Sequence, residues 1–66
     1  MKDFTTQELA VLSLLAKGLK TREIADELNI PIINAKVCMG SIYRKLGVKN
    51  RVQAVVKALT HNIIEV

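Results

Sequence analysis

Hydrophobic positions repeat at helical spacing along this chain, and the clearest example lies at residues 32–46. At 3.6 residues per turn, one side of this stretch is apolar and is the expected core face. That side is formed by Ala35, Cys38, Met39, Ile42 and Leu46. The opposite side carries two cations, two apolar side chains, one glycine and no acid: Ile33, Lys36, Val37, Gly40 and Arg44. The stretch therefore predicts a helix with a buried face and a basic outer face.

A shorter helix and a tight corner precede this stretch. Residues 21–28 give the shorter helix an apolar side made of Ile24, Ala25 and Leu28. Asn29 tolerates the left-handed conformation that ends a helix, and Pro31 prevents the helix from continuing. A short helix, a corner and a longer helix together predict a helix-turn-helix. Neither Ile30 nor Pro31 offers a side-chain oxygen to cap the longer helix, so its first N–H groups need water, Asn34 or an anion.

The first helix has clear start and stop signals. Thr5 and Glu8 have the spacing of a capping box, in which each side chain accepts a hydrogen bond from the other residue's backbone N–H. The helix is expected to run to about Lys17, and Gly18 to supply the left-handed residue after its end. Its expected buried residues are Leu9, Leu12, Leu15 and Ala16.

The last helix begins at a second capping box, Asn50 to Gln53, after the stop that Gly47 provides. It has two apolar faces. One consists of Ala54, Val55 and Ala58, and the other of Val52, Val56, Leu59 and Ile63. A small core needs only one of them, so the second is an interaction surface or covers the end of the domain; we favour interaction. The predicted fold is a compact all-α, four-helix domain spanning residues 1–66.

Composition adds limits to this prediction. The chain has 66 residues, half of them hydrophobic, and its only aromatic side chains are Phe4 and Tyr43. The apolar run at 10–16 contains Ser13 and is too short to cross a bilayer. The single cysteine, Cys38, cannot form an intrachain disulfide. We therefore expect a cytoplasmic protein with no export signal and no membrane partner.

The charge is unevenly distributed. Residues 1–27 carry four Lys/Arg and five acids, whereas residues 28–66 carry six Lys/Arg and one acid, Glu65. The net charge is therefore −1 in the first part and +5 in the second, with no acid from residue 28 to residue 64. Such asymmetry favours a polyanionic partner, above all the phosphates of a nucleic acid.

Catalytic, metal and cofactor sites are not expected. Asp26 and Glu27 are adjacent and point about 100° apart on a helix, which is unsuitable for paired acid–base chemistry. Cys38 and His61 alone cannot hold zinc, and His61 is better explained as a residue at a helix C-terminus. The chain also lacks a glycine-rich phosphate loop.

The ordered motifs resemble a known family, the LuxR/GerE-type helix-turn-helix, which also forms the C-terminal domain of NarL/FixJ-type response regulators. The resemblance covers nearly the whole chain. In the first half it rests on Phe4-Thr5-x-x-Glu8, Val11-Leu12, Leu15-x-x-Gly18 and Glu23-Ile24-Ala25-x-x-Leu28. In the second half it rests on Lys36, Ile42-Tyr43-x-Lys45-Leu46-Gly47-Val48, Asn50-Arg51-x-Gln53-Ala54-Val55 and Ala58.

The chain departs from the family pattern mainly around the longer helix. Where the family usually has Ser-x-x-Thr-Val-Lys, this chain has Pro31-Ile32-Ile33-Asn34-Ala35-Lys36. A common histidine is Cys38, and an often polar, outward-facing position is Gly40. Lys20 replaces the usual Ser or Thr before the 21–28 helix, which would break the capping box with Glu23 and shift the cap to Thr21.

The resemblance implies a bacterial transcriptional regulator that binds double-stranded DNA as a dimer, with the 32–46 helix in the major groove. It implies partners such as RNA polymerase or an attached regulatory domain. Residues expected to approach base edges are Ile33, Lys36, Val37 and Gly40. Residues expected to contact phosphates are Lys20, Thr21, Asn34, Arg44, Lys49 and Arg51. Dimer contacts are expected from Val52, Val56, Leu59 and Ile63.

A second hypothesis stays open. The chain could be a degenerate helix-turn-helix that binds protein through its apolar outer surfaces. The outer face of the 32–46 helix separates the two, because Lys36 and Arg44 favour DNA whereas Ile33, Val37 and Gly40 also suit a protein partner.

Overall fold

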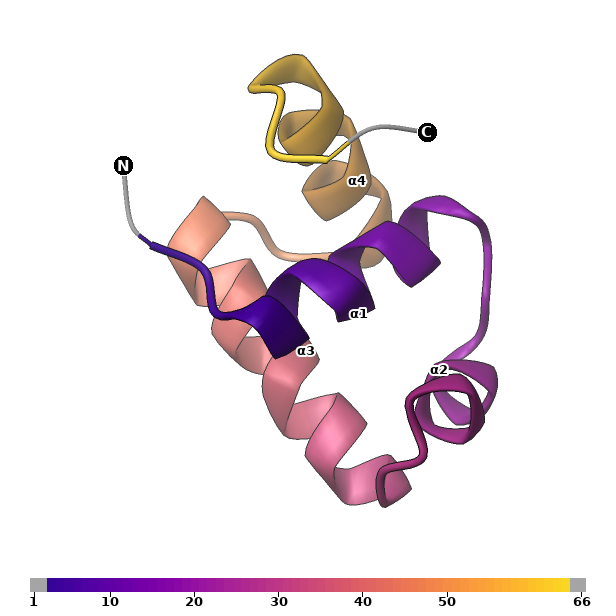
Figure 1. Cartoon of the computed structure of the whole chain (residues 1–66). Helices are drawn as coiled ribbons and strands as arrows, with labels where there is room; N and C mark the ends of the chain where they lie inside the picture. The colour runs from indigo at the N-terminus through magenta and orange to yellow at the C-terminus, as the bar shows by residue number, and fades with distance from the viewer. Residues whose placement is uncertain (1–2, 65–66) are drawn as a thin grey trace.

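The described part of the chain, residues 3–64 of this computed structural model, contains four α-helices. They are α1 (Thr6–Ala16), α2 (Thr21–Leu28), α3 (Ile32–Leu46) and α4 (Arg51–Thr60), as Figure 1 shows. The predicted all-α, four-helix fold is confirmed, with α2 and α3 forming the expected helix-turn-helix.

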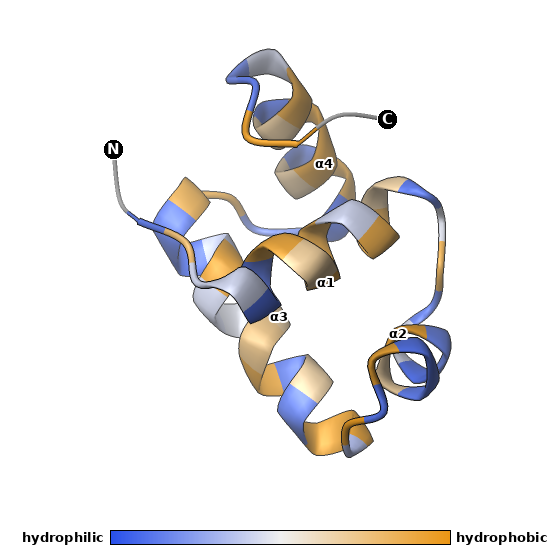
Figure 2. Cartoon of the chain, viewed as in Figure 1, coloured by the Kyte–Doolittle hydropathy of each residue, from blue (hydrophilic) through white to orange (hydrophobic). Residues whose placement is uncertain are grey.

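The longest helix, α3, is the element on which the others pack. It contacts α1, α2 and α4, and α1 in turn contacts α2 and α4. In Figure 1, α1 crosses in front of α3, with α4 at one end and α2 at the other. Figure 2 shows that α2 is mostly hydrophilic outside its buried positions. The core lies between these helices and consists of Val11, Leu12, Leu15, Ile24, Ala25, Ala35, Cys38, Ile42, Leu46, Ala54, Ala58 and Ile64.

The ends of the helices follow the local signals in the sequence. Thr5 Oγ1 accepts from the Glu8 N–H at 3.0 Å, and Glu8 Oε1 accepts from the Thr5 N–H at 2.8 Å. This confirms the first capping box. After α1, Gly18 has a φ of +91°, and after α3, Gly47 has a φ of +70°, a region that glycine adopts without steric cost. Both glycines therefore end their helices as expected.

The buried face of α1 differs from the expected one. Leu9 is 36 % exposed and Ala16 is only half-buried, whereas Val11 is fully buried and Glu8 is 5 % exposed. The real buried face is Glu8, Val11, Leu12 and Leu15. It is turned towards Glu8 because this carboxylate finds its partners on α3, and apolar spacing alone could not reveal those partners.

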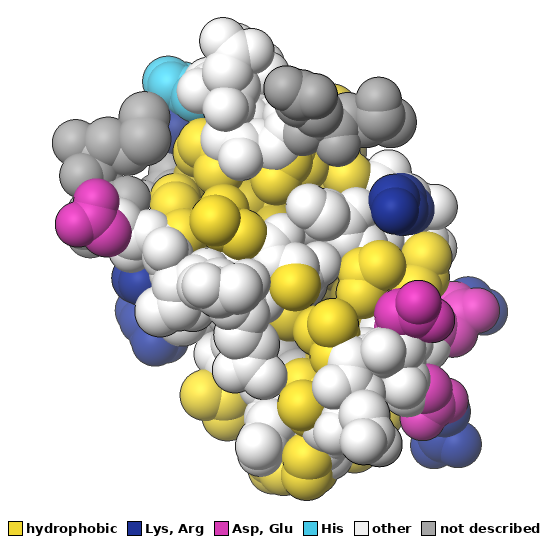
Figure 3. Space-filling view, viewed as in Figure 1, with side chains coloured by type: hydrophobic (Ala, Val, Ile, Leu, Met, Phe, Trp, Pro, Cys, Tyr) yellow, Lys and Arg dark blue, Asp and Glu magenta, His cyan; other side chains and the backbone are white. Residues whose placement is uncertain are grey.

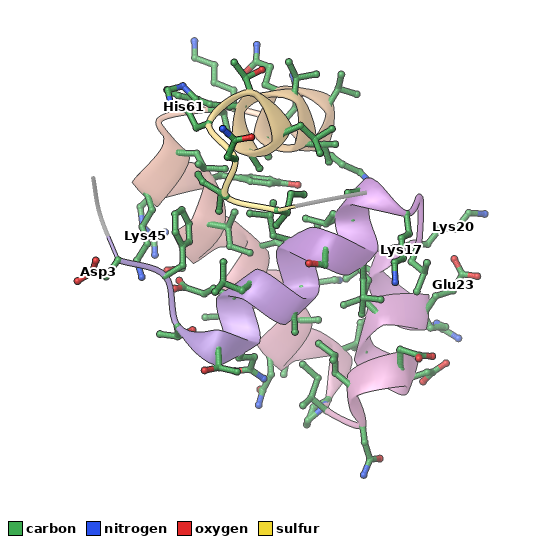
Figure 4. All side chains as sticks on the ribbon, turned by 45° about the horizontal axis from the view of Figure 1, so that its top comes forward. Asp3, Lys17, Lys20, Glu23, Lys45 and His61 are labelled. Carbon is green, nitrogen blue, oxygen red and sulfur yellow. The ribbon has the colours of Figure 1, made fainter. Side chains whose placement is uncertain are left out.

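Glu8 joins the start of α1 to the second half of α3. Lys45 Nζ donates to Glu8 Oε1 at 2.6 Å, and Ser41 Oγ donates to Glu8 Oε2 at 2.5 Å. Lys45 Nζ also donates to the Asp3 carbonyl at 2.9 Å, and Figure 4 shows Lys45 beside the segment that carries Asp3. Within residues 3–64, Glu8–Lys45 is the one ion pair closer than 4.0 Å. Lys45 thus lies towards the core side of α3, with its side chain 26 % exposed.

These contacts hold the Glu8 carboxyl in its charged form. The hydrogen bond from Lys45, followed by those from Ser41 and the Thr5 backbone, lowers the pKa of Glu8 from 4.5 to about 2, against the opposing effect of burial. Because the folded-state pKa lies below the ordinary value, the unfolded chain takes up the proton first as the pH falls. The stability that the charged form contributes is therefore complete above about pH 4.5 and is lost as the pH falls towards about 2.

Replacing Glu8 with Gln should lower the free energy of unfolding by about 1.5–3 kcal/mol near pH 7, because Lys45 loses its charged partner. Urea unfolding followed by circular dichroism measures this loss. The loss should shrink as the pH falls from about 4.5 towards about 2, since wild-type Glu8 then becomes neutral as well.

Glu23→Gln is the matched control, because Glu23 Oε1 accepts from the Lys20 N–H at 2.8 Å in an exposed position. Its cost should stay below about 1 kcal/mol, as for an exposed helix cap. Equal losses for the two variants, or a Glu8→Gln loss that does not change with pH, would contradict the assigned role of Glu8.

Candidate nucleic-acid interface

The corner between α2 and α3 sets the direction of α3. Asn29 adopts the left-handed conformation with a φ of 56°, and the Ile30 N–H donates back to the Ala25 carbonyl at 2.9 Å. Pro31 is then extended and precedes the first residue of α3. Ala25 and Ala35 are both buried, so small side chains stand on both helices next to the corner. The corner is therefore closed by the residues that the sequence predicted.

The outer face of α3 is as exposed as its spacing predicts. Ile33 is 65 % exposed and Val37 is 66 % exposed, and Lys36 and Arg44 are exposed beside them. On the inner face, Ala35, Cys38, Ile42 and Leu46 are buried as expected, and Met39 is half-buried. This leaves a projecting surface with apolar and cationic side chains together.

Gly40 lies on the same outer face, one turn after Val37. It is half-buried, and a Cβ atom at this position would lie 3.7 Å from Nη1 of Arg44. The Arg44 guanidinium thus lies over the position where other residues would carry a side chain. Gly40 itself offers no side chain at this surface, and the polar group beside it is the Arg44 guanidinium.

The first turn of α3 has no side-chain cap, as predicted from Ile30 and Pro31. Asn34 is exposed in this turn and lines a groove of about 320 Å³ between the start of α1 and α3. Other residues lining this groove are Thr5, Gln7, Glu8, Val37, Cys38 and Ser41. The uncapped N–H groups at the start of a helix suit an anion, and Asn34 lies beside them.

The start of α2 differs from the prediction. The cap residue is Lys20 rather than Thr21, and the Lys20 N–H still donates to Glu23 Oε1. Half of the capping box therefore survives, because this hydrogen bond needs only the backbone of Lys20. The Thr21 hydroxyl donates to the Met39 sulfur at 3.7 Å and so faces α3. Figure 4 shows the side chains of Lys20 and Glu23 extending away from the molecule.

The start of α4 is held by a modified version of the predicted capping box. Asn50 Oδ1 accepts from the Gln53 N–H at 2.9 Å, as expected. Gln53 Oε1, however, accepts from the Lys49 N–H at 3.0 Å, one residue before the expected partner. The Lys49 residue is exposed at this helix start, where the helix dipole also favours negative charge.

Arg51 is more involved in the fold than the sequence suggested. Its Nη2 donates to the Leu15 carbonyl at 3.3 Å and to the Leu19 carbonyl, and the residue is half-buried. These carbonyls belong to the end of α1 and the segment after it, where helix hydrogen bonds run out. Arg51 therefore ties the start of α4 to the end of α1. The sequence shows Arg51 only as one of several cations in the second half of the chain, and this did not indicate its role in the fold.

A second surface lies on α4. A groove of about 570 Å³ is lined by Gly47, Val48, Val52, Gln53, Val56, Lys57, Thr60 and His61. Val52 is 71 % exposed and Val56 is 57 % exposed, while Leu59 is 37 % exposed. Ile63, grouped with them from the sequence, is half-buried against the core. His61 is the residue that follows the last turn of α4, as expected. The exposed apolar face of α4 is thus formed mainly by Val52, Val56 and Leu59.

Most of the exposed acidic side chains among residues 3–64 lie on one helix, α2. Acidic side chains gather over α2 in Figure 3, where Glu23, Asp26 and Glu27 are all exposed. From α3 onwards the described residues, 32–64, include no acid. The outer face of α3 itself therefore carries cations and no acidic side chain, which favours a polyanionic partner.

Other kinds of site find no support in the described residues. Residues 3–64 contain no group of three or more His, Cys, Asp or Glu side chains that could hold a metal ion. In the same part of the chain, no helix is long and apolar enough to cross a membrane. Cys38 is buried, and this burial raises the pKa of its thiol, so the thiolate that a nucleophile needs is disfavoured.

Comparison with known proteins agrees with this arrangement. Residues 2–58 match the family described as "Bacterial regulatory proteins, luxR family". The chain is 41 % identical over 61 residues to the response regulator protein VraR of Staphylococcus aureus, and the same values hold for VraR of Staphylococcus saprophyticus. The match covers 92 % of this chain but 29 % of VraR. The chain therefore spans less than a third of the length of these relatives.

A solved structure shows the same fold. The response regulator ChrA of a heme-sensing two-component system superimposes with a TM-score of 0.92 at 33 % sequence identity, covering 97 % of this chain and 32 % of ChrA. The luxR family consists of DNA-binding rather than enzymatic domains, which confirms the expectation that this domain is not an enzyme. The helix-turn-helix, the match over residues 2–58 and the likeness to response regulators lead to one conclusion: the chain belongs to the luxR family of DNA-binding domains of bacterial transcriptional regulators.

Proposed function

We propose that this domain recognises specific sequences in double-stranded DNA by placing α3 in the major groove. The observation that carries this proposal is the outer face of α3, where Lys36 and Arg44 are exposed on a segment without acids. A single helix fits the width of the major groove, and cations on its outer face can reach both base edges and phosphates.

The residues divide into two groups by what they can contact. Ile33, Lys36, Val37 and Gly40 lie on the outer face of α3 and are proposed to face base edges. Lys20, Asn34, Arg44 and Lys49 are exposed around this face and are proposed to bind phosphates. Thr21 and Arg51 are also proposed to bind phosphates, with the donors that their internal hydrogen bonds do not use. These donors are the backbone N–H of Thr21 and the remaining guanidinium N–H groups of Arg51.

A homodimer through α4 is the second part of the proposal. Val52 and Val56 expose apolar surface next to a groove of about 570 Å³, and Leu59 extends this surface along the helix. A two-fold pair of such surfaces would bury these side chains and place two copies of α3 on one side of the duplex, so the binding site would be an inverted repeat. Ile63 would lie at the edge of this contact, since much of it already packs on the core.

Our proposal for the longer protein that would contain this domain is based on its relatives. VraR and ChrA are response regulators of which this chain matches under a third, so we propose that an attached or partner regulatory domain controls this one. Cytoplasmic location and contact with RNA polymerase belong to the same proposal. Residues 1–66 would then form one DNA-binding unit of such a regulator.

Selection from a pool of random duplexes at several salt concentrations tests the main proposal. An enriched inverted repeat supports it. No binding at any salt concentration would favour the alternative, a protein-binding helix-turn-helix whose exposed Ile33 and Val37 contact another chain.

Replacing Lys36 with Ala should weaken binding to the enriched duplex by about 1–3 kcal/mol and relax the base preference at one position, because a donor to guanine is lost. Sequencing the duplexes selected by each protein measures this. Lys17→Ala is the control, since it removes the same charge from an exposed residue at the end of α1. An unchanged motif at full affinity would remove Lys36 from base recognition.

Replacing Lys49 with Ala should weaken binding to every duplex alike and reduce the slope of log affinity against log salt by about one unit. The reason is that a phosphate contact releases a counterion but carries no sequence information. Titrations at several salt concentrations on the enriched duplex and on a scrambled one provide the measurement. A loss confined to the enriched duplex with an unchanged slope would show that Lys49 reads bases instead.

Replacing Val56 with Asp should abolish cooperative binding to a two-half-site duplex and nearly preserve binding to a single half-site. Two like charges would meet near the dimer axis, whereas the monomer should stay folded because Val56 is already 57 % exposed. Gel-shift titrations on both duplexes, with circular dichroism of the free protein, provide the test.

Asn62→Asp adds the same charge at an exposed residue outside the groove and should leave cooperativity intact. If cooperativity survives in Val56→Asp, the dimer contact lies elsewhere; if this variant unfolds, the apolar face belongs to the core.

A further inference from the structure

We infer that Met39 is a site of reversible oxidation that controls how α2 packs against α3. The oxidant is a peroxide that transfers one oxygen atom to the thioether, and the product is methionine sulfoxide. The loss of stability that follows does not depend on the proposed function, whereas the loss of DNA affinity rests on it.

Two adjacent sulfur atoms of α3 differ in their access to an oxidant. Cys38 is 8 % exposed, and its burial raises the pKa of the thiol, which disfavours the reactive thiolate. Met39 is only half-buried and packs at the edge of the buried core. A thioether reacts without first losing a proton, so its oxidation depends on exposure rather than on ionisation. Met39 is therefore the more reactive of the two.

A hydroxyl group faces the Met39 sulfur. Thr21 Oγ1 donates to Met39 Sδ at 3.7 Å, and within residues 3–64 this is the one side-chain hydrogen bond between α2 and α3. A thioether sulfur is a weak acceptor. A sulfoxide oxygen is a much stronger one, and the Thr21 hydroxyl stands where it can donate to this oxygen after the reaction.

The place of this contact in the fold gives the modification its effect. The corner at residues 29–31 joins the end of α2 to the start of α3, and Thr21 is the first residue of α2, at the opposite end of that helix. Its contact with Met39, 18 residues away, holds this far end against the middle of α3. The corner and the Met39 contact together therefore hold both ends of α2 on α3.

The reaction needs only the peroxide. The Met39 sulfur attacks one oxygen of hydrogen peroxide, and an S–O bond forms as the O–O bond breaks. The proton on the transferred oxygen moves to the departing hydroxide, which leaves as water. Sulfur loses two electrons and the peroxide gains two, so the step balances without a further co-reactant.

The sulfoxide replaces a flexible apolar side chain with a polar one at a packed contact. Met39 packs against the buried cluster of the core, where a polar oxygen without full hydrogen bonding is costly. The first turn of α2 should therefore loosen from α3. Lys20 and Thr21, the proposed phosphate contacts at the start of α2, then lose their fixed position relative to the outer face of α3.

Treatment with hydrogen peroxide, at a dose that leaves the circular dichroism spectrum helical, tests the site. Peptide mass spectrometry should find one added oxygen on Met39 and none on Cys38. The melting midpoint should fall by about 4–8 °C, as for the loss of one modest contact in a domain of this size. Affinity for the enriched duplex should fall about fivefold, which is about 1 kcal/mol. Methionine sulfoxide reductases, but not a thiol reductant alone, should restore both values.

Two variants assign the effect to this contact. Met39→Leu nearly keeps the side-chain volume but removes the sulfur, and it retains Met1, the other methionine of the chain. Its melting midpoint and duplex affinity should not respond to the same treatment. Thr21→Val keeps the shape of residue 21 but removes the hydroxyl. Oxidation should lower the midpoint of this variant by more than that of the wild type, because the sulfoxide then lacks its donor.

Peroxide that leaves Met39 unmodified, or that oxidises it without lowering the melting midpoint, would overturn the inference. An equal response in Met39→Leu would do the same, because the effect would then come from another residue. Equal falls in Thr21→Val and the wild type would remove the role of Thr21, and a lowered midpoint with unchanged affinity would overturn the link to DNA. Absence of binding to every duplex before treatment would instead refute the proposed function, while the melting midpoint still decides the role of Met39.

Discussion

The carboxylate of Glu8 is the interaction on which the arrangement of the domain depends. A buried charge is costly unless it is paired and hydrogen-bonded, and Glu8 meets this requirement only when α1 lies against α3. Its two oxygens accept from Thr5, Ser41 and Lys45, so one group both caps α1 and fixes where α1 crosses α3. With α1 covering the inner side of α3 in this way, the residues on the outer side are left facing solvent.

Much of the fold could be predicted because its signals are local. The capping box at Thr5, the left-handed Asn29 and the glycines after α1 and α3 each act within a few residues, and helical spacing identified the inner face of α3. The burial of Glu8 could not be predicted in the same way. Its partner Lys45 is 37 residues away along the chain, so apolar spacing placed Leu9 rather than Glu8 on the buried face of α1.

In the candidate site, too, some features follow from the local sequence and others depend on tertiary packing. The exposure of Ile33, Val37 and Arg44 follows from their positions on one helix, and the structure agrees. The directions of Thr21 and Arg51 do not follow from local sequence, because a cation or hydroxyl at a helix start suits a phosphate and a backbone carbonyl equally well. Their partners, Met39 and the carbonyls of Leu15 and Leu19, are brought near only by tertiary packing.

The tie between Arg51 and the end of α1 has a consequence for how the chain folds. The corner between α2 and α3 joins residues close in sequence, so it can form at little cost in chain entropy. Arg51 lies 36 residues from Leu15, and its contact with the Leu15 carbonyl closes a loop that contains α2, the corner and α3. We therefore expect α2 and α3 to organise first, and α1 and α4 to pack against them afterwards. In a dimer through α4, association would then favour the final step of folding as well as the spacing of the two recognition helices.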